Sequence, residues 1–199
     1  NFNGTVGGNV SGTSDLAPLT EQAQMILDLF PEAKTVALLY ASGEANSRYQ
    51  VKVVGEYLQS KGITVLDRAF TDSNDATVVA AAAAEAADVI YVPTDNTAAG
   101  CAQAINGVIG DTPLIAGEEG ICAGCGVATL TISYYDLGVA TGKMAAKILK
   151  GEANISEMPV EYAANFTKKY NPIRCAELGI DTAALEAAGY VAIEIATAD

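Results

Sequence analysis

Histidine is absent from the 199 residues of this chain, and basic residues are scarce. Eleven lysines and arginines stand against 24 aspartates and glutamates, which gives a formal net charge of -13 at pH 7. Without histidine the chain can form neither a Ser-His-Asp triad nor a histidine general base, and most catalytic zinc sites are excluded. The negative field repels phosphate backbones, so nucleic-acid binding is not expected. No uninterrupted apolar run of about 18 residues occurs, so no segment is predicted to span a membrane.

The four cysteines are too few to form a disulfide framework in a chain of this length. Cys122 and Cys125 form a single C-x-x-C motif, whereas Cys101 and Cys175 are isolated and do not complete a structural zinc site. A structural or incidental role is the main interpretation of the pair, and a local disulfide is the alternative. We expect neither a metal ion nor a cofactor.

Short apolar runs alternate with amphipathic stretches along most of the chain, and the connections between them are short and polar. The runs predict strands at residues 35–40, 63–66, 88–92, 112–116 and 127–132. The stretches predict helices at residues 18–30, from 48 to about 59, at 75–87, from 98 to about 109, and at 134–149. This alternation predicts an α/β fold, a doubly wound parallel sheet with helices on both faces.

The remaining segments have weaker patterns. Residues 117–126 are rich in glycine and are predicted to form a loop. After Gly151 we expect a short strand at 160–162, a helical turn at 176–178 and a final helix at 182–188.

Polar residues follow the strands predicted to end near Tyr40, Val92, Ala116 and Ile132. Ligands of an open parallel sheet bind beyond the carboxyl ends of its strands, so these loops form the candidate site. The candidate residues are Ser42, Glu44, Ala45, Asn46, Thr94, Asp95, Asn96, Glu118, Glu119 and Tyr134. The alternative for each loop is that its side chains only cap a neighbouring helix. The carboxylates would repel a phosphate and attract an ammonium group.

Neither a Walker phosphate loop nor a G-x-G-x-x-G turn between a strand and a helix occurs, which disfavours nucleotide binding. Glu118 and Glu119 could in principle perform acid–base chemistry. Adjacent residues seldom converge on one bond, however, and no nucleophile stands beside them. We therefore expect a binding protein and not an enzyme.

Several segments resemble the signatures of one family, the substrate-binding components of ABC importers for aromatic amino acids of the tryptophan/tyrosine-binding type. The resemblance runs in order from about Asn9 to Gly189. It is carried by Asn9-Val-Ser-Gly-Thr-Ser-Asp15, Ser42-Gly-Glu-Ala-Asn-Ser47, Tyr91-Val-Pro-Thr-Asp-Asn-Thr97, Gly117-Glu-Glu-Gly120, Tyr134-Tyr-Asp-Leu-Gly138, Thr141–Gly151 and Met158-Pro-Val-Glu-Tyr162. The pair Cys122 and Cys125 is not part of the family pattern.

The resemblance implies a type I periplasmic-binding-protein fold, in which two doubly wound lobes joined by three crossings close on a ligand. It identifies this chain as the second lobe. We accordingly expect a hinge segment at 1–17, the ligand-binding lobe at 18–133, a helix and hinge of the absent first lobe at 134–158, and a return to the second lobe at 159–199. It also implies an extracytoplasmic location, periplasmic or as a cell-surface lipoprotein, with signal and anchor outside this sequence, and a membrane permease as partner.

The same resemblance implies roles for the candidate residues in binding tryptophan, tyrosine or phenylalanine. Backbone amides of the segment that contains Ser42, Glu44, Ala45 and Asn46 would hold the ligand carboxylate. Asp95, Glu118 or Glu119 would pair with its ammonium group, while Thr94 and Asn96 would add hydrogen bonds. Tyr134, and as a weaker candidate Tyr40, would stack on the aromatic side chain.

Two further expectations remain open. A ligand-sensing effector domain of a transcription regulator with the same fold is the alternative function. The helix at 134–150 places Leu137, Ala140, Met144 and Ile148 on one face, which would lack its cover without the first lobe. We therefore expect a homodimer of this chain through that helix.

Overall fold

The structure is a computed structural model that describes residues 4–195. Residues 1–3 and 196–199, which belong to the expected hinge segment and to the expected return, lie outside the described residues. The internal contacts divide the chain into two units. Unit 1 comprises residues 4–17 and Ile132–Thr167, and unit 2 comprises Pro18–Thr131 and residues 168–195. The assignment of these segments to a hinge, to one lobe and to an absent lobe stays a prediction.

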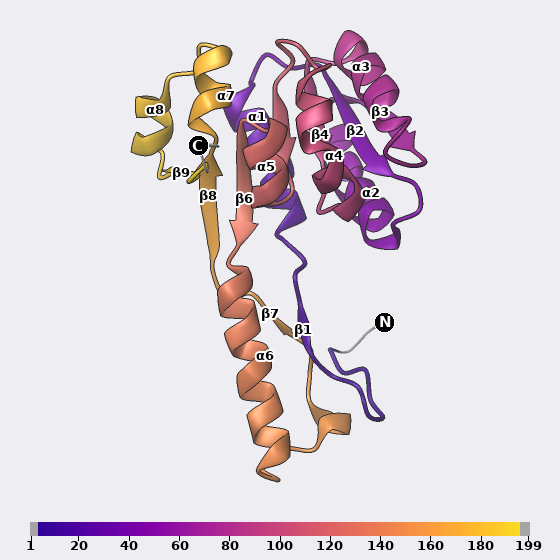
Figure 1. Cartoon of the computed structure of the whole chain (residues 1–199), viewed down its shortest axis with the longest axis vertical. Coiled ribbons are helices and arrows are strands. Elements are labelled where there is room, and N and C mark those ends of the chain that lie inside the picture. The colour runs from indigo at the N-terminus through magenta and orange to yellow at the C-terminus, as the bar shows by residue number, and fades with distance from the viewer. Residues whose placement is uncertain (1–3, 196–199) are drawn as a thin grey trace. The chain divides into compact units, whose positions relative to one another are not determined.

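A sheet of seven strands, counted within the described residues, runs in the order β3-β2-β4-β5-β6-β8-β9 (Figure 1). The strands are β2 (Thr35–Ala41), β3 (Thr64–Phe70), β4 (Val89–Val92), β5 (Leu114–Ala116), β6 (Ala128–Ile132), β8 (Phe166–Tyr170) and β9 (Val191–Ala192). The pairs β2–β3, β2–β4, β4–β5, β5–β6 and β8–β9 are parallel. The predicted α/β fold with a parallel sheet is thus confirmed for these five strand pairs.

Helices cover both faces of this sheet. The helix α1 (Leu19–Leu29) precedes β2. Each of the strands β2 to β5 is then followed by one helix, in order α2 (Ala45–Ser60), α3 (Ala76–Ala86), α4 (Asn96–Asn106) and α5 (Glu119–Cys125). α1 packs with α2, whereas α3 packs with α4 and α4 with α5. Alternate side chains of β2 point to opposite faces of the sheet. Ala37 and Leu39 pack in the core with α3–α5, whereas Leu38 lies against Gly55 of α2. Both faces of β2 and β4 are therefore buried.

The segment predicted as a glycine-rich loop at 117–126 is instead largely helical, because it contains α5. The carboxylate of Glu118 accepts hydrogen bonds from the amides of Gly120 and Ile121 and so caps the helix. Glycine here serves close packing: a Cβ on Gly124 would lie 2.4 Å from the Cβ of Ala102 in α4. The glycines that suggested a loop are thus compatible with a helix pressed against its neighbour.

The strand β3 and the C-terminal third also differ from the prediction. The strands β8 and β9 were not predicted, and β3 extends to Phe70 instead of ending at 66. The helical turn predicted at 176–178 is the end of α7 (Pro172–Glu177), which begins earlier because Asn171 caps the amides of Ile173 and Arg174 and Pro172 occupies the first turn. The predicted final helix is α8 (Thr182–Ala187).

Unit 1 contains α6 (Tyr134–Leu149), the short helix η1 (Ile155–Glu157) and a pair of parallel strands, β1 (Thr13–Ser14) and β7 (Glu161–Tyr162). The helix predicted at 134–149 is confirmed residue for residue. α6 packs with β1, and the hydroxyl oxygens of Thr13 and Thr141 lie 2.8 Å apart.

The expectation that the apolar face of this helix lacks cover is wrong for two of its four residues. Leu137 and Met144 are buried in the chain itself, and Ala140 and Ile148 are half-buried. The physical reason is that β1 packs on the helix and that the segment 161–165 lies opposite it, both within unit 1. The argument for a homodimer through residues 134–150 therefore loses its basis, and we do not propose one.

Candidate functional site

Three of the candidate loops lie at one edge of the sheet, because they follow the neighbouring parallel strands β2, β4 and β5. Hydrogen bonds join the first two loops directly. The side-chain amide of Asn46 donates to the carbonyl of Thr94 at 2.8 Å, and the hydroxyl of Ser47 donates to the same carbonyl at 3.4 Å. Gln50 accepts a hydrogen bond from the amide of Thr94 at 3.0 Å. The loop after β4 is thus held by the first turns of α2.

Glu44 immediately precedes α2 but caps a different helix. One carboxylate oxygen accepts from the amide and the hydroxyl of Thr97, both at 2.8 Å, and the other accepts from the amide of Asn96 at 3.1 Å. Burial alone would raise the pKa of Glu44, but these hydrogen bonds outweigh it and lower the pKa below its ordinary value. Glu44 is thus a carboxylate fixed at the N-terminus of α4.

Asp95 is 1% exposed and also uses both carboxylate oxygens within the protein. One accepts from the amide of Ala98 in α4, and the other accepts from the amide of Ala41 at the end of β2, each at 2.8 Å. The side chain therefore joins β2 to α4. Its position in the chain suggested a partner for a ligand ammonium group, but its contacts are those of a buried cap.

Glu118 and Glu119 also have partners in unit 2. Glu118 caps α5, as described above, and Glu119 forms an ion pair with Lys169 of β8 at 2.7 Å. All four carboxylates nominated from the sequence are therefore engaged with backbone amides or with a lysine. The capping alternative explains the hydrogen bonds that Glu44, Asp95 and Glu118 accept from backbone amides.

The N-terminus of α2 differs from those of α4 and α5, because its N-cap residue Glu44 places no side-chain hydrogen bond on it. Ala45 and Asn46 are exposed there, and the carbonyl of Ser42 accepts a hydrogen bond from the guanidinium of Arg48. The first amides of a helix carry partial positive charge and favour an anion. Within the described part of unit 2, this turn therefore combines exposure with uncapped amides.

The two candidate tyrosines lie elsewhere. Tyr134 begins α6 in unit 1, is about half exposed, and donates a hydrogen bond to Asp15 at 3.4 Å. Tyr40 is buried in β2, and its hydroxyl donates to Asp67 of β3 at 3.3 Å. Burial and this aspartate raise the pKa of Tyr40. Tyr40 is therefore largely buried, and its stacking on a ligand stays a prediction.

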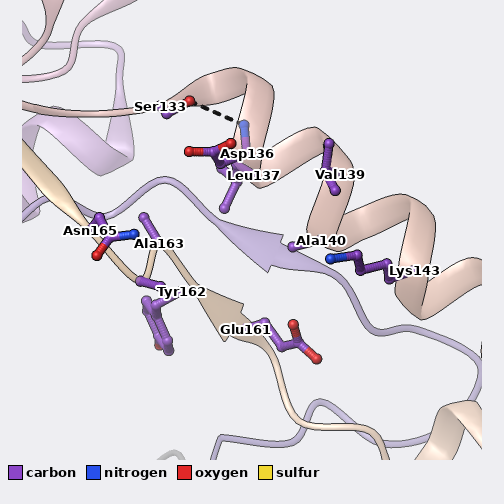
Figure 2. Close-up of a pocket in the computed structure, with 11 residues that line it drawn as sticks. Ser133, Asp136, Leu137, Val139, Ala140, Lys143, Glu161, Tyr162, Ala163 and Asn165 are labelled. Carbon is purple, nitrogen blue, oxygen red and sulfur yellow. Dashed lines mark hydrogen bonds between the residues drawn. The ribbon is translucent and has the colours of Figure 1, made fainter.

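Unit 1 contains a cavity of about 430 Å³ between α6 and the segment 161–165 (Figure 2). Asp136 and Lys143 extend from α6, and Glu161 lies on β7 across the cavity. Ser133, at its rim, caps the amide of Asp136 at 3.1 Å. No candidate site residue from the sequence lines this cavity.

The cysteines are free, buried thiols, and the local disulfide is not formed. Burial raises the pKa of Cys122 well above its ordinary value and that of Cys125 to about 12. Both thiols are therefore protonated and unreactive near neutral pH. Among residues 4–195 no group of three or more potential ligands could hold a metal ion.

Gln22, Gln50 and Gly117 also shape this edge and were not nominated from the sequence. Gly117 approaches the preceding loop so closely that a Cβ would lie 2.6 Å from the backbone of Pro93 and Thr94. Gln22 falls in the apolar stripe of α1, and a polar residue in such a stripe is the signal that could have identified it.

A parallel sheet with helix N-termini at its carboxyl edge is an arrangement in which α/β proteins bind small molecules. The chain belongs to the ABC transporter substrate-binding protein family, whose pattern matches residues 3–188.

Named relatives agree with this membership. The chain is 31% identical over 156 residues to a tyrosine-binding protein of Clostridioides difficile (strain R20291), covering 77% of this chain and 45% of the relative. The ABC domain of Streptococcus pneumoniae in complex with L-Trp matches with a TM-score of 0.86 at 32% identity, over 97% of this chain and 68% of that one. An open, ligand-free substrate-binding protein with adhesive properties from Clostridium difficile matches with a TM-score of 0.74 at 33% identity, over 94% and 64%. The chain thus spans less than half the length of the curated relative.

More distant structures share the fold alone. LacI-family regulators match at 10% to 18% identity with TM-scores of 0.55 and 0.56. They confirm the expected type I periplasmic-binding-protein-like architecture and carry no functional conclusion.

Proposed function

We propose that this chain supplies the ligand-binding lobe of an extracytoplasmic protein that delivers an aromatic amino acid to an ABC importer and has no enzymatic activity of its own. The observation that carries the proposal is the neighbour solved with L-Trp, which is 32% identical over 97% of this chain. The name of the curated relative, a tyrosine-binding protein, supports the same ligand class. A membrane permease is the proposed partner.

The ligand carboxylate is proposed to bind at the N-terminus of α2, at the amides of Ala45 and Asn46. Support comes from the exposure of these residues and from the lack of a side-chain cap on α2. A carboxylate placed there gains from both the free donors and the helix dipole. Ser42 belongs to the same turn.

The ligand ammonium group is proposed to approach Glu44, whose half-buried carboxylate is kept ionised by the amides of α4. The oxygen that accepts from the amide of Asn96 retains bonding capacity, since a carboxylate accepts about four hydrogen bonds and Glu44 accepts three from Asn96 and Thr97. Thr94 and Asn96 flank it, and Glu118 is a second acceptor. Asp95 and Glu119 are proposed only to support this edge, and Tyr134 stays a prediction as an aromatic contact.

Unit 1 is proposed to be part of the first lobe, completed by polypeptide that this sequence does not contain. Support comes from large apolar side chains that unit 1 leaves exposed, among them Tyr135 at 81% and Leu149 at 86%. The relatives provide the second support, because about a third or more of each has no counterpart in this chain.

None of the helices in the described part of the chain is long and apolar enough to cross a membrane.

A regulator's effector domain is the weaker alternative, because the regulators share only the fold while the family match is to importers. The natural gene distinguishes the two. A signal sequence upstream supports the importer protein, whereas a DNA-binding segment upstream supports a regulator.

Calorimetric titration of the full natural chain with each of the twenty amino acids tests the ligand class. We expect L-tryptophan or L-tyrosine to bind and to raise the melting temperature by mass action. Binding only of branched-chain or other non-aromatic amino acids would overturn the aromatic assignment.

A substitution tests the carboxylate site. In Ala45→Pro the first amide of α2 is removed at a position where proline is compatible with a helix and the preceding residue is already extended. We expect about tenfold weaker binding with nearly unchanged stability, since one hydrogen bond to a charged group is lost. Full affinity in this variant would move the carboxylate site elsewhere.

A further inference from the structure

Gln22 is a glutamine with no exposed surface in the packed face of α1. Its neighbours on that face, Leu19, Ala23 and Ile26, are buried apolar residues. A polar amide in such surroundings is unfavourable unless its hydrogen bonds are made inside the protein.

The side chain of Gln22 makes three hydrogen bonds to residues distant in the sequence. Its Nε2 donates to the carbonyl of Gly117 at 3.0 Å and to the carbonyl of Leu130 at 2.9 Å. Its Oε1 accepts from the hydroxyl of Tyr91 at 2.6 Å. Both amide protons are therefore used, and one side chain connects α1 to three strands or their ends.

The two carbonyls lie where neighbouring strands separate. The pairing of β5 with β6 ends at Ala116 and Thr129. Gly117 directly follows β5 and Leu130 is the next residue of β6, and their carbonyls are bridged by the side-chain amide of Gln22 instead of by the other strand. Gln22 thus stabilises the point at which β5 and β6 diverge.

This point connects the candidate edge with the chain crossings between the units. Gln22 follows the crossing at residues 17/18 by one helical turn, and Leu130 precedes the crossing at 131/132. Gly117 is the residue before Glu118, and its amide donates to Val92 at 2.7 Å. The side-chain amide of Gln22 therefore holds the start of α1, the end of β6 and the loop after β5 together.

We propose that Gln22 is a positioning residue of the ligand site, which holds the loop at Gly117 and the end of β6 as one rigid block. The proposal rests on the proposed binding function. A merely structural alternative is that Gln22 serves only to satisfy the buried hydroxyl of Tyr91.

Three variants of the full natural chain separate these roles. Gln22→Met keeps the size of the side chain and removes all three hydrogen bonds. Tyr91→Phe removes only the hydroxyl and leaves both carbonyls bonded to Gln22. The double variant Gln22→Met/Tyr91→Phe lacks the unpaired hydroxyl, so it recovers stability while the two carbonyls stay unbridged.

Each variant is titrated with L-tryptophan and L-tyrosine, and its amide hydrogen exchange is followed at Gly117. We expect Gln22→Met and the double variant to bind about tenfold more weakly and Tyr91→Phe to bind within about twofold of the wild type. We also expect exchange at Gly117 to rise about tenfold in the first two and not in Tyr91→Phe.

Wild-type affinity in the double variant, or equal losses in Tyr91→Phe and Gln22→Met, would overturn the positioning role. Failure of the wild type to bind either amino acid would instead reject the proposed function. In that case hydrogen exchange still decides the question: unchanged protection of Gly117 in the double variant would overturn the rigid block, and faster exchange would support it.

Discussion

Carboxylates at the candidate edge are largely occupied by backbone amides of the same edge. Asp95 bonds the amides of Ala41 and Ala98, and Glu44 bonds those of Asn96 and Thr97. Capping α4 with two carboxylates neutralises its N-terminal partial charge and leaves the uncapped turn of α2 as the stronger attractor for an anion. Carboxylates at the same edge of the sheet therefore differ in their availability to a ligand, because some of their oxygens already accept hydrogen bonds from backbone amides.

Replacing Asp95 tests its assignment as a cap. Asp95→Ala leaves the amides of Ala41 and Ala98 buried without an acceptor, so we expect the free energy of unfolding to fall by about 2–4 kcal/mol. Urea denaturation measures this loss. The control Asp111→Ala removes an exposed carboxylate and should change stability by less than about 0.5 kcal/mol. Equal stability of both variants would contradict the cap.

The sequence predicted which loops meet at the edge, because parallel strands impose that arrangement. It could not predict which side chains stay available, since capping partners come from other loops. Glu44 adjoins α2 and caps α4, a contact that spans 53 positions in the sequence to Thr97. Gln22 was missed for the same reason, because its partners lie 69 to 108 positions away.

At the scale of elements, α5 shows how a glycine-rich segment becomes a helix. Its residues Ile121, Cys122 and Cys125 are buried, and Glu118 caps its N-terminus. Gly124 permits the approach to Ala102 of α4. Tertiary packing here outweighs the low helix propensity of glycine.

A matched pair of glycine substitutions tests this packing. Gly124→Ala would place a methyl group 2.4 Å from the Cβ of Ala102, so we expect a loss of about 1–3 kcal/mol in the free energy of unfolding. Gly100→Ala in the neighbouring helix α4 meets nothing within 4 Å and should stabilise the protein by about 0.5–1 kcal/mol. Thermal and urea unfolding measure both. Stabilisation by Gly124→Ala would show that α5 can move away from α4.

The predicted elements were most accurate where one periodicity extended over many residues. The predicted bounds of α6 match the structure, and those of α1 lie within one residue at each end. The strand β8 was missed because its residues Phe166–Tyr170 are mostly exposed and polar, so no apolar run marks it. It is specified by its neighbours in the sheet, which a local pattern does not contain.

At the scale of the whole molecule, apolar burial is distributed unequally between the units. Unit 2 contains a continuous core formed by β2, β4, β5 and the helices α3–α5. Unit 1 buries a few apolar side chains, among them Leu137, Met144 and Met158, and exposes Tyr135 and Leu149. Because apolar burial is the main source of stability, unit 1 should be the less stable of the two in this chain.

Amide hydrogen exchange on the 199-residue chain tests this inequality. We expect the amides of α6 to exchange about 100-fold faster than those of β4, since opening α6 exposes few buried side chains. In a longer natural chain that carries the proposed remainder of the first lobe, protection of α6 should rise, because Tyr135 and Leu149 acquire partners. The strand β4 is the internal control, and its protection should change little. Equal protection of α6 in the two chains would contradict the assignment of unit 1 to an incomplete lobe, because an added lobe that buried this helix would necessarily slow its opening.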